Sequence, residues 1–129
     1  RLVAGAPDAA AIESATGVTI DDRVWDGDRV HVGNVSLEVI GLVGHTPGSI
    51  ALAWTPEHGA AHLFVGDSLF PGGPGKTTTP EDFRSLMTDL EAKVFGRFGD
   101  DTVVHPGHGD PTTLGRERAG IPQWWARGW

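Results

Sequence analysis

Apolar and polar positions alternate along much of the chain in short runs that end at glycine, proline or asparagine. This period of two is typical of half-buried strands separated by turns. Five strands are predicted in this way: Arg29–Val32, Val35–Val43, Ser49–Thr55, Ala61–Val65 and Thr102–His105. Four of the five come in the first half of the chain, which indicates one sheet built mainly from consecutive strands.

Two segments carry a helical pattern instead. The alanine-rich stretch Pro7–Thr16 is opened by Asp8 or the proline before it and is stopped by Gly17. A second helix is predicted after Thr79, an N-cap residue followed by Pro80 and two acids. Its apolar residues recur at spacings of three and four: Phe83, Leu86, Met87, Leu90 and Val94. Because this helix separates two late strands, the predicted class is α/β.

Composition narrows the function. The chain has 129 residues, enough for one domain, and a net charge of −7. An acidic balance argues against nucleic acid or an anionic membrane as the partner. The absence of cysteine excludes disulfides, iron–sulfur clusters and thiol catalysis. No apolar run reaches the ~18 residues needed to span a bilayer, and no leader pattern is seen, so we expect a cytoplasmic protein.

Three polar side chains follow three of the predicted strands, each flanked by glycine or proline. His45 follows the strand that ends at Val43, Asp67 follows the next strand but one, and His108 follows the last. Two imidazoles and a carboxylate suit zinc, iron or manganese. Spacing alone leaves two interpretations open, since the three are far apart in sequence: metal ligands, or two ordinary loop histidines and a turn-forming aspartate.

The residues around these positions resemble the later motifs of the metallo-β-lactamase-fold hydrolases. The matching segments, in family order, are Gly44–Ser49, Gly66–Phe70 and Pro106–Gly109. The glyoxalase II-like branch is the most similar, because its Asp-Ser/Thr-Leu-Phe motif precedes a glycine-rich loop with a basic residue, here Pro71–Thr77 with Lys76. The resemblance runs from about Trp25 to about Glu117. It implies the second half of an αββα sandwich, a mixed sheet with flanking helices.

The resemblance also implies roles. His45 would bind a first metal, Asp67 would bridge both metals and be catalytic, and His108 would bind the second. Two zinc ions are expected, with iron possible, and the hydroxide held between them would attack a small thioester, ester or lactone. Two alternatives remain: an iron-dependent persulfide dioxygenase of the same fold, and a non-catalytic half-domain that binds a partner.

The family's first signature, His-x-His-x-Asp-His, is absent from the chain. We therefore expect residues 1–129 to be a single partial domain, the C-terminal portion of a larger hydrolase domain that carries the activity. Alone, the chain would offer each metal two ligands, so we expect it to hold metal partly or not at all and to be inactive. An uncovered sheet face would favour self-association or a missing N-terminal half.

Other polar residues are weaker candidates. Lys76 could meet a substrate carboxylate or phosphate, although a solvated loop lysine is the favoured interpretation. Thr46 and Asp110 are candidates for supporting a metal-binding histidine through hydrogen bonds without touching the metal. For Asp110 the alternative is an exposed turn aspartate. His105 is expected to point away from the site. Three further histidines are interpreted as structural or surface residues: His31, His58 and His62.

Overall fold

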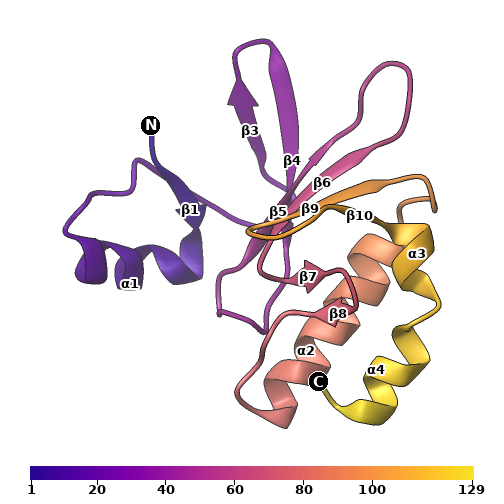
Figure 1. Cartoon of the computed structure of the whole chain (residues 1–129). Coiled ribbons are helices and arrows are strands. Elements are labelled where there is room, and N and C mark those ends of the chain that lie inside the picture. The colour runs from indigo at the N-terminus through magenta and orange to yellow at the C-terminus, as the bar shows by residue number, and fades with distance from the viewer.

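A computed structural model describes residues 1–129 and centres on a six-stranded sheet (Figure 1). Its strands in spatial order are β10 (Thr112–Thr113), β9 (Val103–Pro106), β6 (His62–Gly66), β5 (Ile50–Trp54), β4 (Val35–Gly41) and β3 (Arg29–Val32). Neighbouring strands run antiparallel except β6 and β9, which are parallel. Both of these strands therefore end at the same edge of the sheet, which brings the loops that follow them together.

Helices cover one face of this sheet (Figure 1). They are α2 (Pro80–Asp89), its π-helical continuation η1 (Leu90–Phe95), α3 (Leu114–Arg118) and α4 (Ile121–Arg127). The start of α2 is as predicted, because Thr79 Oγ1 accepts a hydrogen bond from the Asp82 backbone N–H at 3.0 Å. All five apolar residues predicted on its inner face are buried. None of the helices is long and apolar enough to cross a membrane.

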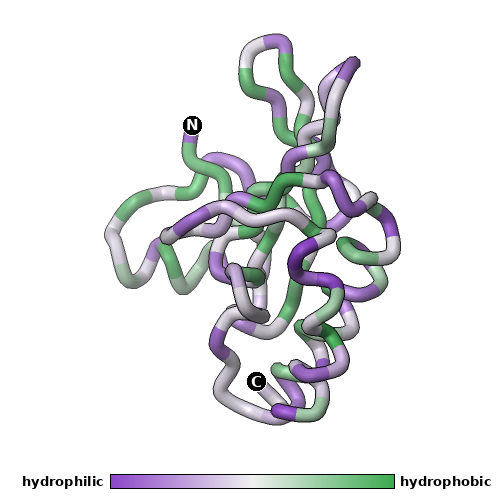
Figure 2. The backbone as a smooth tube through the Cα atoms, turned by 45° about the vertical axis from the view of Figure 1, so that its right-hand side comes forward, coloured by the Kyte–Doolittle hydropathy of each residue, from purple (hydrophilic) through white to green (hydrophobic).

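The core lies between the helices and the sheet. Alternate strand residues such as Ala51, Leu63 and Val104 point into a cluster of 16 buried side chains. Hydrophobic stretches accordingly alternate with hydrophilic turns along the chain (Figure 2). Trp124 is part of this cluster, which fixes the C-terminal helix α4 on the body. Strand alternation thus selects which residues face the helices.

The opposite face of the sheet is open at one end. Five side chains line a shallow, wholly apolar hollow there, and we call this surface the open face: Val32, Val35, Leu37, Trp54 and Phe64. The hairpins β3–β4 and β5–β6 carry it beyond the helices (Figure 1). Next to Phe64, His105 Nε2 lies 3.0 Å from His62 Nδ1. His105 therefore points along the open face.

A small N-terminal unit packs beside the sheet. Strands β1 (Val3–Gly5) and β2 (Asp22–Val24) pair in parallel and are joined by α1 (Ala6–Thr16). Neither strand was predicted, because three residues are too few for a periodic pattern. The helix begins after Gly5, with no side-chain cap, so Asp8 lies inside its first turn and does not open it.

Other boundaries also differ from the sequence-based prediction. Strand β4 ends at Gly41, before the predicted Val43, because the Val43 N–H donates to Asp89 Oδ2 at 2.9 Å. The glycine-rich segment after β6 contains the two-residue strands β7 (Leu69–Phe70) and β8 (Gly73–Pro74). These differences arise from contacts with residues distant in sequence.

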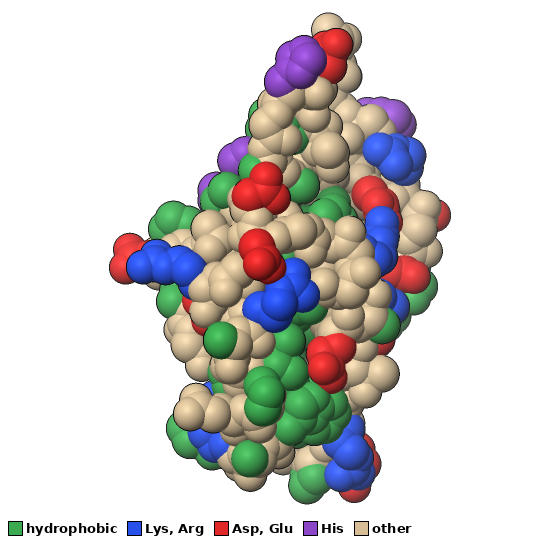
Figure 3. Space-filling view, turned by 90° about the vertical axis from the view of Figure 1, so that its right-hand side faces the viewer, with side chains coloured by type: hydrophobic (Ala, Val, Ile, Leu, Met, Phe, Trp, Pro, Cys, Tyr) green, Lys and Arg blue, Asp and Glu red, His purple; other side chains and the backbone are tan.

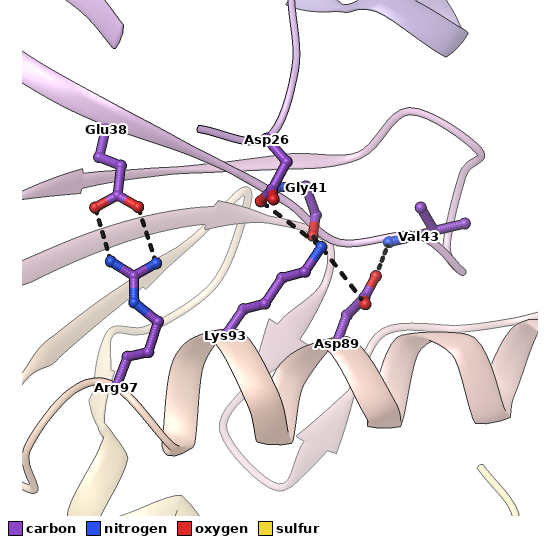
Figure 4. Close-up of polar contacts among 7 residues, drawn as sticks. All are labelled: Asp26, Glu38, Gly41, Val43, Asp89, Lys93 and Arg97. Carbon is purple, nitrogen blue, oxygen red and sulfur yellow. Dashed lines mark hydrogen bonds and ion pairs between the residues drawn. The ribbon is translucent and has the colours of Figure 1, made fainter. Parts of the chain in front are cut away.

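Charged side chains tie the helical layer to β4 (Figure 4). The Arg97 guanidinium donates to both Glu38 carboxylate oxygens, at 2.8 and 2.9 Å. Lys93 Nζ donates to the Gly41 carbonyl at 2.9 Å and lies 3.6 Å from an Asp89 oxygen. The Arg97 guanidinium holds the pKa of Glu38 below its ordinary value of 4.5, chiefly through these hydrogen bonds.

Glu38→Gln is therefore expected to lower the free energy of unfolding by about 0.5–1 kcal/mol at pH 7, since the pair is partly exposed. The folded-state pKa is depressed, so the stabilisation is present above the unfolded pKa and is lost as pH falls through the folded pKa. Urea unfolding at pH 7 and at pH values below 4.5 measures this loss. Glu57→Gln, on an exposed turn, is the control. If Glu38→Gln lost as much unfolding free energy between pH 7 and acid pH as the unaltered chain, the prediction would be contradicted.

Candidate metal centre

His45, Asp67 and His108 meet at one edge of the sheet. His45 Nε2 lies 3.6 Å from Asp67 Oδ2, and His108 Nε2 lies 3.6 Å from Asp67 Oδ1. Each carboxylate oxygen therefore faces a different imidazole. The side chains of His45 and Asp67 are 29% and 37% exposed and that of His108 is 75% exposed, so the group is open to solvent.

The parallel strands β6 and β9 explain why Asp67 and His108 are neighbours. The Gly107 N–H donates to the Gly66 carbonyl at 2.7 Å, which continues the pairing past the strand ends. A Cβ atom at position 107 would lie only 2.5 Å from Asp67 Oδ1. Glycine at this position is what allows the carboxylate to sit against the turn that carries His108.

The ring of His45 is held in one orientation. Its Nδ1 lies 2.6 Å from the backbone carbonyl of Lys76. A carbonyl oxygen only accepts, so Nδ1 carries a proton, and Nε2 is the ring nitrogen that faces Asp67. Histidine ligands of metals are commonly held in this way. Lys76 thus touches the site through its backbone, while its side chain is exposed.

A buried carboxylate anchors the loop that supplies this carbonyl. Glu117 accepts a hydrogen bond from the Gly72 N–H at 2.8 Å and one from the Thr112 hydroxyl at 2.6 Å. At its other end the loop is fixed by the Gly75 N–H, which donates to the Ser68 carbonyl at 3.0 Å. Sequence reasoning missed Glu117, because nothing in its surroundings separates it from the other acids of the tail.

A second carboxylate lies behind the loop of His45. Thr46 Oγ1 donates to Asp8 Oδ2, and the Gly48 N–H donates to Asp8 Oδ1 at 2.8 Å. Thr46 Oγ1 also lies 2.6 Å from Ser49 Oγ, which donates to it because the Thr46 proton is already used. Thr46 therefore supports the loop, whereas the sequence indicated for Asp8 only a helix start.

The last histidine has less support. The ring of His108 packs on Phe70, with centroids 4.8 Å apart. Asp110 is exposed, and no hydrogen bond joins it to His108. Of the two interpretations of Asp110, the structure thus favours the exposed turn aspartate over a hydrogen bond that orients His108. On the face shown in Figure 3, acidic and basic side chains are interspersed, with histidines toward its upper end.

The donor set fits two ions that share Asp67. Two ligands of one ion at bonds of ~2.0–2.2 Å are separated by roughly 3–4.5 Å, and both 3.6 Å distances lie in this range. No three His, Asp or Glu side chains of the chain converge on one point. Each half of the group therefore offers two donors, and a zinc ion bound there needs further ligands. Beside Asp67, a hollow of about 250 Å³ extends to Asp8 and Ile12.

Comparison with known proteins identifies relatives by sequence. Hydroxyacylglutathione hydrolase GloC of Haemophilus influenzae is 35% identical over 98 residues, which are 75% of this chain and 44% of that protein. Hydroxyacylglutathione hydrolase of Polaromonas sp. is 39% identical over 90 residues, 69% of this chain and 33% of that protein. The chain thus spans less than half the length of these relatives. No known family profile matches it.

Solved structures show the same fold. The B3 metallo-β-lactamase BLEG-1 superposes with a TM-score of 0.74 at 24% identity, over 94% of this chain and 63% of that chain. ETHE1 from Myxococcus xanthus gives 0.69 at 26% identity, over 89% and 55% of the two chains. TTHA1623, solved in a di-iron-bound form, gives 0.61 at 27% identity, over 90% and 61%. The mixed sheet with its flanking helices is therefore of the metallo-β-lactamase type.

Proposed function

We propose that His45, Asp67 and His108 are ligands of a two-metal hydrolase centre. The chain resembles the C-terminal part of the metallo-β-lactamase-fold hydrolases, in their glyoxalase II-like branch, which supports this proposal. One observation carries the proposal. The two oxygens of Asp67 each face a separate histidine at 3.6 Å, as a carboxylate shared by two ions requires.

Each residue of the group has a separate proposed role. His45, fixed through Nδ1 by the Lys76 carbonyl, would hold one ion with Asp67, and His108 would hold the other with Asp67. Zinc, when bound, supplies Lewis acidity and lowers the pKa of water toward neutrality. We propose that the Lys76 ammonium, which is exposed on its glycine-rich loop, binds a substrate carboxylate.

Among small thioesters, esters and lactones, we favour a hydroxyacyl thioester of glutathione. Two relatives carry the name hydroxyacylglutathione hydrolase. Glutathione brings two carboxylates, for which an exposed lysine is a suitable partner. The open, solvent-exposed arrangement of the three ligands leaves room for such a substrate.

An iron-dependent persulfide dioxygenase is the second candidate. Two histidines and one carboxylate also suit a single iron ion, and ETHE1 of M. xanthus is among the similar structures. A single ion would need all three side chains around one point, whereas here the histidines face different oxygens of Asp67. This difference favours the hydrolase.

Metal analysis and an activity assay test the proposal. Both are performed on the protein purified from its native cells. We expect two zinc ions per chain and hydrolysis of a hydroxyacyl-glutathione thioester. One iron per chain with oxygen uptake on a persulfide would establish the dioxygenase instead. A protein with neither metal nor turnover would be the non-catalytic half-domain. For residues 1–129 alone we expect weak metal binding and no hydrolysis, since each ion finds two ligands.

A further inference from the structure

We propose that Asp8 is a positioning residue for the metal centre: its carboxylate fixes the loop that carries His45. The inference rests on the proposed function, because positioning matters only if His45 binds a metal. Asp8 lies 37 positions before His45 in a different structural unit. It touches neither His45 nor Asp67 through any hydrogen bond, so it acts through the loop.

Both oxygens of Asp8 are used on this loop. One accepts from the Thr46 hydroxyl and the other from the Gly48 N–H at 2.8 Å, so the carboxylate spans the proline between them. Ser49 completes the arrangement through its hydroxyl contact with Thr46 at 2.6 Å. The residues immediately after His45 are therefore held by one partly buried carboxylate.

Steric fit supports the same contact. A Cβ atom on Gly48 would lie 2.5 Å from the Asp8 backbone nitrogen, and one on Gly5 would lie 1.8 Å from the Gly48 carbonyl oxygen. The first turn of α1 is thus pressed against the loop with no space for a side chain between them. This close approach brings the Asp8 carboxylate within hydrogen-bond distance of the loop.

Asp8 lies in the first turn of α1, where a negative charge is favourable, but neither capping nor an ion pair accounts for its side-chain contacts. It does not cap α1, whose N-cap is Gly5 without a side-chain bond. No lysine, arginine or histidine lies within ion-pair distance of it. Its hydrogen bonds go to Thr46 and Gly48 alone.

Fixing the loop has a consequence for metal binding. The ring of His45 is held at Nδ1 by the Lys76 carbonyl, and Thr46 and Gly48, which follow it in the chain, are held by Asp8. A ligand held at both ends loses little conformational freedom when it binds an ion. Without Asp8, the loop would be less ordered before the metal binds. The free-energy cost of ordering it would then lower the affinity for the metal that His45 binds.

The test compares Asp8→Ala and Asp8→Asn with Thr46→Val, which removes one arm of the contact from the other side. Glu13→Gln is the matched control. Glu13 lies on the same helix but accepts from the Ile20 N–H and from Arg23, away from the loop. Amide hydrogen exchange at Gly48 is measured on the metal-free chain of 129 residues. Zinc affinity is measured on the protein as its cells make it, by competition with a chelator.

Asp8→Ala should speed exchange of the Gly48 amide and weaken zinc binding by about 10- to 100-fold, the range for residues that hold metal ligands from behind. Asp8→Asn should show smaller changes in both Gly48 exchange and zinc affinity. Thr46→Val should also weaken zinc binding. Glu13→Gln should change neither quantity. Unchanged Gly48 exchange in Asp8→Ala, or zinc affinity insensitive to Asp8 and Thr46 alike, would overturn the proposal. If the unaltered protein takes up no zinc while Gly48 exchange depends on Asp8, the proposed function fails and the fixing of the His45 loop stands.

Discussion

Asp67→Ala is expected to weaken binding of the metal pair by at least about 100-fold and to reduce thioester hydrolysis to the background rate. Both oxygens of this carboxylate face an imidazole, at 3.6 Å each, so its removal takes a ligand from both ions at once. Asp67→Asn keeps the shape but loses the charge, and should retain some metal while losing most activity. Metal content after exposure to a chelator, together with kcat/KM, measures both effects.

Lys76→Ala is the control for this experiment. Its side chain is exposed and its contact with His45 is made by the backbone carbonyl, which alanine also provides. We therefore expect unchanged metal content and kcat, with KM raised several-fold through loss of a partner for the substrate carboxylate. If Lys76→Ala abolished turnover and Asp67→Ala left it intact, the metal mechanism would be wrong.

Residues 1–129 alone are expected to self-associate, and we propose the open face of the sheet as the surface. Val32 and Phe64 on this face are 62% and 44% exposed. The backbone of its inner strands is already paired, so a partner must pack on side chains. The five side chains of the open face come from four strands, β3, β4, β5 and β6, and line one continuous apolar hollow. A continuous exposed apolar patch marks an interaction site, and the expected dimer is weak because the patch is small.

Charge favours a second copy as the occupant. The strands of the open face contain two charged residues, Arg29 and Glu38, which stand opposite each other in register. Both point to the other side of the sheet, where Glu38 binds Arg97. Two copies of a chain with net charge −7 repel over most of their surfaces, but not where uncharged faces meet.

Sedimentation of the chain over a range of concentrations tests this proposal. Val32→Asp should raise the dimer dissociation constant by at least about 10-fold, because a carboxylate would be buried at the interface. Val18→Asp introduces the same charge at a position 43% exposed outside the open face and should have no effect. A chain that remains monomeric at every concentration, or equal effects of the two variants, would contradict self-association through this face.

Local sequence patterns predicted most strands of the sheet, the main helix and the three candidate ligands. Alternation located β3, β5, β6 and β9 to within about a residue at most ends, and the Thr79-Pro80 start located α2. These features depend on neighbours two to four positions apart, which a sequence displays directly. The loop positions of His45, Asp67 and His108 were visible for the same reason, since each follows a strand and is framed by glycine or proline.

The contacts that hold those candidate ligands depend on the tertiary fold. The Asp8 carboxylate reaches a loop 38 and 40 positions away, the Lys76 carbonyl meets a ring 31 positions away, and Glu117 accepts from a backbone N–H 45 positions away. The short strands β1, β2, β7, β8 and β10 likewise exist through pairing and carry no pattern of their own. Hydrogen bonds between distant segments form once the chain has folded, and their partners are common polar residues or backbone groups that local sequence does not distinguish. The strand pattern therefore predicts where a metal would be bound, and the packing of α1 and the glycine-rich loop determines how the candidate ligands are held.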